Sequence, residues 1–169
     1  MRGTGILSGA LVCAALLGAT PLWAADPAQA FVERASATGL GEIEAAKLAL
    51  GRSRAADVKT FAVHLVDDHT KTNVQLKTLA ESRQLKLADG PDAATRERLK
   101  TLAASPDDAF DAAFAQAEAQ AYEQTLKLYG EAAEHAEDPD IRQFAQTTLA
   151  VLRLHLEMAR QLAEAHPAR

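Results

Sequence analysis

One glutamate, two histidines and one tyrosine are the residues of this sequence best suited to chemistry. Glu42, His69 and His155 fall in apolar stripes, where core positions are separated by steps of four and three residues as on one face of a helix. Tyr122 lies alongside a further stripe of this kind. A buried carboxylate or imidazole without a partner costs several kcal/mol, so these groups must be paired, coordinated or linked to water.

The four residues can meet at one level of a helical bundle. Residues at equal distances from a hairpin turn lie at equal heights on the two antiparallel helices. With turns near 52–53 and 137, all four residues lie roughly 16–27 Å from a turn, near the middle of helices about 40 Å long. This mid-height position holds both for short up-and-down connections and for a long crossover. We therefore expect these side chains to share an interior layer.

Two interpretations of this layer stay open. The first is a transition-metal or redox site, with a metal such as iron held by inward carboxylate and imidazole groups. The second is a buried polar network that fixes the register of the helices. A di-iron carboxylate bundle needs Glu-x-x-His on two of its helices, and the sequence contains no Glu-x-x-His. The metal hypothesis takes as ligands Glu42, His69, His155 and Tyr122, with Asp68 and Asp111 as residues that orient them.

The elements that must position these groups are helices. Asp26-Pro27, Ser105-Pro106 and Asp138-Pro139 each pair a helix-capping residue with proline at the first helical position. Val and Ile are sparse, Ala is abundant, and no segment alternates with period two, so no strands are expected. The predicted long helices span 27–50, 54–85, 106–135 and 139–165, and a short helix spans 92–103 in the connection between the second and third. Four amphipathic helices bury their stripes against one another, which predicts an all-α four-helix bundle.

Two glycines interrupt the first predicted helix beside Glu42. Gly39 and Gly41 each cost about 1 kcal/mol relative to alanine in a helix. They indicate close approach of a neighbouring segment, an irregular turn, or fraying of this part of the helix.

The first 24 residues have the pattern of a Sec-type signal peptide, with Arg2, a short apolar run and a cleavage region in which we expect cleavage after Ala24. Residues 25–169 then form a single domain, predicted to be periplasmic or otherwise extracytoplasmic and not inserted in a membrane. Removal of the leader also removes Cys13, the only cysteine, which excludes a disulfide or a cysteine nucleophile. The net charge changes from −5 to −6 without Arg2, which argues against nucleic acid or an anionic membrane surface as partner.

Several short motifs resemble the domain of unknown function 4142 family. They are Gly39-Leu40-Gly41-Glu42, Asp67-Asp68-His69 with Asn73, and His155-Leu156. The resemblance implies an exported bacterial bundle of ferritin-like fold with no established activity. It also implies that the polar positions of the family correspond to Glu42, His69, Asp111 and His155. The family commonly has histidine where this chain has Tyr122, and a tyrosine can also ligate iron.

No recognisable catalytic arrangement accompanies these features. We therefore expect a non-enzymatic exported bundle that serves envelope stress or acts as a binding module. The main alternative is a ferritin-like metal-binding or oxidoreductase bundle that uses Glu42, His69 and His155. A chaperone-like protein, a third possibility, would need an exposed apolar patch, whereas the stripes are expected to be used internally. The sequence leaves the substrate, the partner and the oligomeric state open.

Overall fold

The computed structural model describes residues 26–168, so the predicted signal peptide and its cleavage site lie outside the described part of the chain. The described residues form helices joined by short loops, with no strand among them, which confirms the predicted all-α helical bundle. The helices are α1 (Pro27–Arg52), α2 (Ala56–Ser82), α3 (Ala93–Ala103), α4 (Phe110–His135) and α5 (Pro139–Ala165). The short helix α3 lies in the predicted connection between α2 and α4.

Aspartates begin three of the helices. The carboxylate of Asp26 accepts a hydrogen bond from the backbone N–H of Ala28 at 2.9 Å, at the start of α1. Asp138 does the same for Asp140 at 2.8 Å, at the start of α5. Asp92 accepts from Thr95 at 2.7 Å and so caps α3. Each carboxylate satisfies a backbone donor that has no partner within the helix.

The predicted start of the third long helix at 106 is wrong. Residues 106–109 form a turn, with the N–H of Ala109 donating to the carbonyl of Pro106 at 3.1 Å, and α4 begins at Phe110. The physical reason lies at the end of α1. Arg52 donates to the carbonyl of Ser105 at 2.7 Å and pairs with Asp107 at 2.6 Å, which holds the segment outside the helix.

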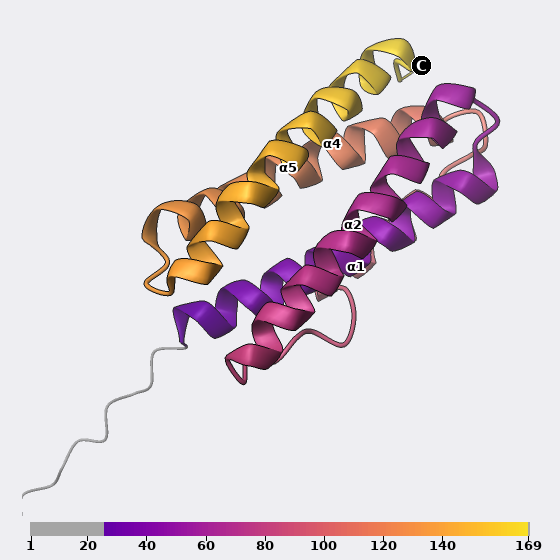
Figure 1. The fold of residues 1–169 in the computed structure, drawn as a ribbon. Helices are drawn as coiled ribbons and strands as arrows, with labels where there is room; N and C mark the ends of the chain where they lie inside the picture. Colours follow the sequence, from indigo (N-terminus) through magenta and orange to yellow (C-terminus); the bar gives the residue numbers. More distant parts are fainter. Residues whose placement is uncertain (1–25, 169) are drawn as a thin grey trace, which may run out of the picture.

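The helices form two antiparallel hairpins, α1–α2 and α4–α5, which pack through the pairs α1–α4 and α2–α5 (Figure 1). The connection from α2 to α4 returns along the length of the bundle, and α3 within it packs on α1 and α4. Arg83, just after α2, forms ion pairs with Asp138 and Asp140 at the start of α5. The topology is therefore the long crossover, one of the two that the sequence left open.

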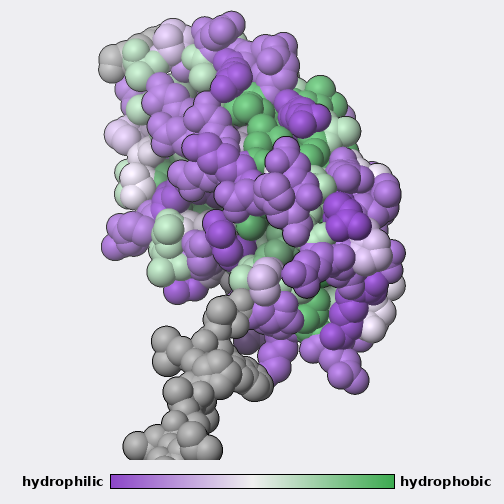
Figure 2. All heavy atoms as spheres, turned by 90° about the vertical axis from the view of Figure 1, so that its left-hand side faces the viewer, coloured by the Kyte–Doolittle hydropathy of each residue, from purple (hydrophilic) through white to green (hydrophobic). Residues whose placement is uncertain are grey.

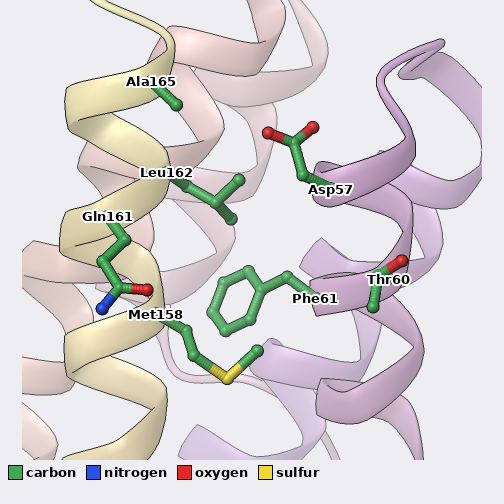
Figure 3. A pocket seen from close by; sticks show the side chains of 7 residues that line it. All are labelled: Asp57, Thr60, Phe61, Met158, Gln161, Leu162 and Ala165. Atoms are coloured by element: carbon green, nitrogen blue, oxygen red, sulfur yellow. The ribbon is translucent and has the colours of Figure 1, made fainter.

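The core contains an aromatic cluster near each end of the bundle. Phe31 packs edge-on against Tyr129, with ring centroids 5.3 Å apart, near the start of α1. Phe61 and Phe114 lie 6.1 Å apart near the opposite end. Between these clusters lies a layer of buried polar residues. The end of the bundle that holds the start of α1 and the α4–α5 turn is predominantly hydrophilic at its surface, with hydrophobic atoms visible in places between the polar side chains (Figure 2). None of the helices in residues 26–168 is both long and apolar enough to cross a membrane.

The two glycines of α1 mark close approach of neighbouring segments. A Cβ atom added at Gly39 would lie 2.2 Å from the side-chain oxygen of Asn73 on α2. One added at Gly41 would lie 2.4 Å from the methyl carbon of Thr95 on α3. The helix is continuous through both positions, so neither irregularity nor fraying explains them.

We expect Gly41→Ala to lower the free energy of unfolding by about 1 kcal/mol, because an overpacking cost of about 1–3 kcal/mol exceeds the gain in helix propensity of about 1 kcal/mol. Gly51→Ala is the matched control on the same helix, since no atom lies within 4 Å of its added Cβ. That variant should be as stable as the wild type or slightly more so. Urea unfolding of both variants checks the prediction, which fails if the two substitutions have the same effect.

Candidate functional site

Three rings from three helices meet in the middle of the bundle. The imidazole of His69 (α2) shares a hydrogen bond of 2.8 Å between its Nε2 atom and the hydroxyl of Tyr122 (α4). The ring of His155 (α5) lies 5.6 Å from that of His69 and 5.3 Å from that of Tyr122, measured between centroids. All three side chains are buried. The predicted meeting of these residues in one layer is therefore present in the structure.

An aspartate on the neighbouring helix orients His155. The Nε2–H group of His155 donates to the carboxylate of Asp68 at 3.1 Å. This hydrogen bond places the ring proton on Nε2 and leaves Nδ1 buried, with no partner among the described residues. Burial lowers the pKa of His155, while Asp68 opposes that shift. His155 is thus a neutral imidazole near pH 7, held in one tautomer from α2.

Two fully buried glutamates flank this ring cluster on the side of α1 and α4. Glu42 comes from α1 and Glu118 from α4, one turn before Tyr122. The guanidinium of Arg98 on α3 reaches both, with nitrogen–oxygen distances of 2.7 Å to Glu42 and 3.2 Å to Glu118. A cation from the crossover segment therefore neutralises carboxylates of the bundle interior.

Each of the two buried glutamates changes the pKa of the other. The second carboxylate oxygen of each is buried and has no hydrogen-bond partner among the described residues. Burial and the nearby charge of Glu42 raise the pKa of Glu118 well above its ordinary value. Burial alone would raise the pKa of Glu42, but the neighbouring Glu118 and the charge of Arg98 bring it below the ordinary value. Near pH 7 the pair is thus one carboxylate and one carboxylic acid, balanced by one guanidinium.

The imidazole of His69 and the phenol of Tyr122, beside the two glutamates, are uncharged. Burial lowers the pKa of His69 to about 4, despite the opposing charge of Glu42. Burial raises the pKa of Tyr122 well above 10.0, and the glutamates add to that shift. The interior layer is therefore electroneutral near pH 7, with formal charges on Arg98 and Glu42, while the carboxylate of Asp68 lies at its edge with the side chain 34% exposed. Neutrality allows so many polar groups to remain buried.

A polar crevice of about 320 Å³ leads from the surface to this layer. It lies where α1, α3 and α4 adjoin, and both Glu42 and Arg98 line it. The other hydrogen-bonding side chains in its lining are Arg34, Thr38, Asp92, Thr95, Gln120, Gln124 and Thr125. The side chain of Arg98 is 22% exposed, whereas those of Glu42 and Glu118 are buried, so Arg98 is the accessible charged group at the inner end of the crevice.

The family model for the domain of unknown function DUF4142 matches residues 17–162, which is most of the chain. The chain belongs to this family. No curated protein and no solved structure was found to match it. The family assignment confirms the resemblance drawn from the short motifs and carries no activity with it.

In this DUF4142 chain, only one of the two residues predicted to orient the site, Asp68 and Asp111, contacts the layer. Asp68 contacts His155 directly. Asp111 lies in the first turn of α4, about 10 Å along the helix from Glu118. It forms no hydrogen bond with the layer, and its buried Oδ1 atom has no partner among the described residues. Arg98 and Glu118 belong to the layer but are not among the site residues predicted from the sequence.

Hydrogen bonds and an ion pair occupy most of the atoms of the layer that could bind a transition metal. The Nε2 atoms of His69 and His155 are hydrogen-bonded to Tyr122 and Asp68. Glu42 is paired with the guanidinium of Arg98, which occupies the position of a cation between the carboxylates. Among residues 26–168 no three His, Asp, Glu or Cys side chains converge as metal ligands would. A metal ion at Glu42 would have to displace Arg98, whereas Nδ1 of His155 has no partner among the described residues.

Proposed function

We propose that this DUF4142 protein is exported and acts as a binding module, with its ligand in the polar crevice above Arg98. The interior layer supports a role in binding rather than in catalysis. Its glutamates share a guanidinium, and its imidazoles are neutral and hydrogen-bonded to fixed partners. Such a layer rigidifies the bundle beneath the crevice, which is what a preformed binding site needs.

One observation carries this proposal: a concave site lined by hydrogen-bonding groups from three helices ends on Arg98. Its volume of about 320 Å³ lies at the lower end of the range of about 300–1,000 Å³ found for small-molecule sites. Two arginines and two glutamine amides supply most of the donors. The ligand is accordingly a small molecule with hydrogen-bond acceptors, such as a carboxylate or a hydroxylated compound.

NMR titration of the purified protein with acetate, glycine and glucose tests the proposal. We expect at least one of these probes to shift the side-chain amide signals of Gln120 and Gln124. Gln124→Leu should weaken that response. Gln143→Leu, at an exposed position on α5, is the matched control and should leave it unchanged. If none of the probes moves the crevice signals, this assignment of the ligand site is wrong.

Two further measurements separate the proposal from its alternatives. Cell fractionation should recover the protein outside the cytoplasm with Ala25 as its first residue; retention of the unprocessed chain in the cytoplasm would contradict export. Elemental analysis tests the metal-binding alternative directly. Stoichiometric metal in the wild type that is lost in the His69→Ala/His155→Ala double variant would replace the binding module with a metal protein.

A further inference from the structure

A second cavity adjoins the polar crevice along the groove between α1 and α4. It has a volume of about 620 Å³ and lies between the first turns of α1 and the last turns of α4. Arg34 and Leu128 line both cavities, so the two meet at these side chains. The groove therefore has a polar part, which ends on Arg98, and a larger second part toward the α4–α5 turn.

The second cavity has an apolar floor. Phe31, Leu128, Ala132 and Ile141 line it, and all four are buried, so the cavity is an indentation in the core rather than a flat patch. From Leu128 to Ala136 on α4 it extends about 12 Å, at a rise of about 1.5 Å per residue. A single alkyl chain of medium length fits a recess of this length and lining.

Charge is distributed unevenly around this groove. Asp26, Glu137 and Asp138 line the far end of the apolar cavity, where Asp138 is paired with Arg83, and Glu131 lines it one turn from Leu128. At the junction with the polar crevice stands Arg34, which has no carboxylate within ion-pair distance of 4.0 Å in the described part of the chain. Arg98 on the floor of the crevice is already balanced by the glutamates. An anionic head group is consequently attracted to Arg34 and repelled by the far end.

We propose that the groove binds a free single-chain carboxylate of fatty-acid type, with its head group on Arg34 and its alkyl chain along Phe31, Leu128 and Ile141. This inference rests on the proposed binding function and names the class of ligand. The apolar cavity accepts the chain, the junction supplies the only arginine without an ion pair in the lining of the two cavities, and the crevice donors complete the contacts with the head group. Two-chain lipids do not match a groove with one apolar cavity.

Isothermal titration calorimetry with decanoate tests this inference. We expect decanoate to bind more tightly than acetate, because only decanoate fills the apolar cavity. Arg34→Gln should weaken decanoate binding by at least about tenfold, the effect expected for loss of a charge-assisted hydrogen bond. Ala132→Phe, which fills the cavity, should abolish the advantage over acetate. Arg153→Gln and Ala150→Phe, at exposed positions on α5, are the matched controls and should bind as the wild type does.

Circular dichroism establishes that each variant is folded before its affinity is compared. Tighter binding of decyltrimethylammonium than of decanoate would place a cationic head at the acidic end and overturn the inference. Binding to phosphatidylglycerol vesicles without binding to decanoate would also overturn it, in favour of a membrane surface. If acetate binds in the crevice and decanoate binds no better, this inference fails while the proposed function stands. If neither decanoate nor acetate binds, this inference fails, and the proposed function fails with it if glycine and glucose also leave the crevice signals unchanged.

Discussion

Arg98→Met is expected to lower the free energy of unfolding by about 3–5 kcal/mol, the effect typical of removing one partner from a buried ion pair. The substitution leaves Glu42 and Glu118 fully buried without a cation. Much of the methylene chain of Arg98 is retained in methionine, so the loss reflects charge rather than packing. The remaining carboxyl pair then binds protons more strongly than in the wild type.

The loss of unfolding free energy in the Arg98→Met variant should increase as the pH rises. Without the guanidinium, the folded-state pKa of Glu118 rises further above the unfolded value of 4.5, and the pKa of Glu42, which lies below 4.5 in the wild type, rises as well. A carboxyl group with a raised folded pKa is destabilising at pH values above its unfolded pKa, increasingly so as the pH rises. The deficit relative to the wild type should therefore be smaller near pH 5 than near pH 8.

Urea unfolding at these two pH values measures the effect. Lys100→Met is the matched control, because it removes a positive charge from the same helix at a position where the side chain is 78% exposed. An exposed pair contributes at most about 1 kcal/mol, so this variant should differ little from the wild type. The triple variant Arg98→Met/Glu42→Met/Glu118→Met should recover most of the lost stability. Equal stability of the Arg98→Met and Lys100→Met variants would contradict the role assigned to Arg98.

The position of the polar layer could be predicted from periodicity alone. His69 and His155 occupy core positions of helices whose turns are marked by glycine and proline, and the constant rise of an α-helix converts residue numbers into heights. The helix starts at Asp26 and Asp138 follow equally from local rules of capping, because the donors and acceptors involved are neighbours in the chain.

Arg98 could not be assigned in this way, because its partners come from helices distant in the sequence. Helix α3 carries several charged residues, and capping or composition does not say which of them faces inward. A weak signal exists in hindsight: Thr95, Arg98 and Leu102 follow the spacing of one helical face, and Leu102 is the buried residue of α3. Glu118 carries a similar signal, since it lies one turn before Tyr122 on the same face of α4.

The predicted start of α4 at 106 is wrong for a similar reason, because residues distant in the sequence hold this segment. Ser105 and Pro106 form a favourable local start for a helix, but Arg52 from α1 binds the carbonyl of Ser105 and the carboxylate of Asp107. Several tertiary hydrogen bonds to a guanidinium outweigh one cap, which contributes about 1 kcal/mol. Both corrections therefore involve arginines that join distant segments, a type of contact that leaves no periodic pattern in the sequence.

Stability of the wild type is expected to fall as the pH is lowered from about 6.5 toward 4, mainly because of His69. Burial keeps this imidazole neutral in the folded protein, with a pKa of about 4 against 6.5 for the unfolded chain. In that window the unfolded state binds the proton and the folded state does not, so unfolding is favoured as the pH falls. The difference in pKa corresponds to about 3 kcal/mol. The lowered pKa of His155 acts in the same direction.

The contribution of the buried glutamates to the pH dependence of stability must be separated from that of His69. The raised pKa of Glu118 gives a contribution of opposite sign, since its stability is lost as the pH rises above 4.5. The lowered pKa of Glu42 costs stability only as the pH falls below 4.5. Urea unfolding between pH 7 and 4.5 therefore compares the wild type with His69→Leu/Tyr122→Phe, a double variant that removes both members of the hydrogen-bonded pair.

This double variant should lose less stability than the wild type over that pH range, by about 2 kcal/mol. His135→Gln removes a histidine whose side chain is 78% exposed, and it should preserve the pH dependence of the wild type. Glu42 and Glu118 are present in all three proteins. Loss of His69 removes one influence that lowers the pKa of Glu42, and that change affects stability mainly below pH 4.5, outside the range compared. Parallel pH profiles for the double variant and the wild type would mean that His69 is not held neutral by burial. His69 would then carry a charge in the folded protein, and the layer beneath the crevice would not be electroneutral.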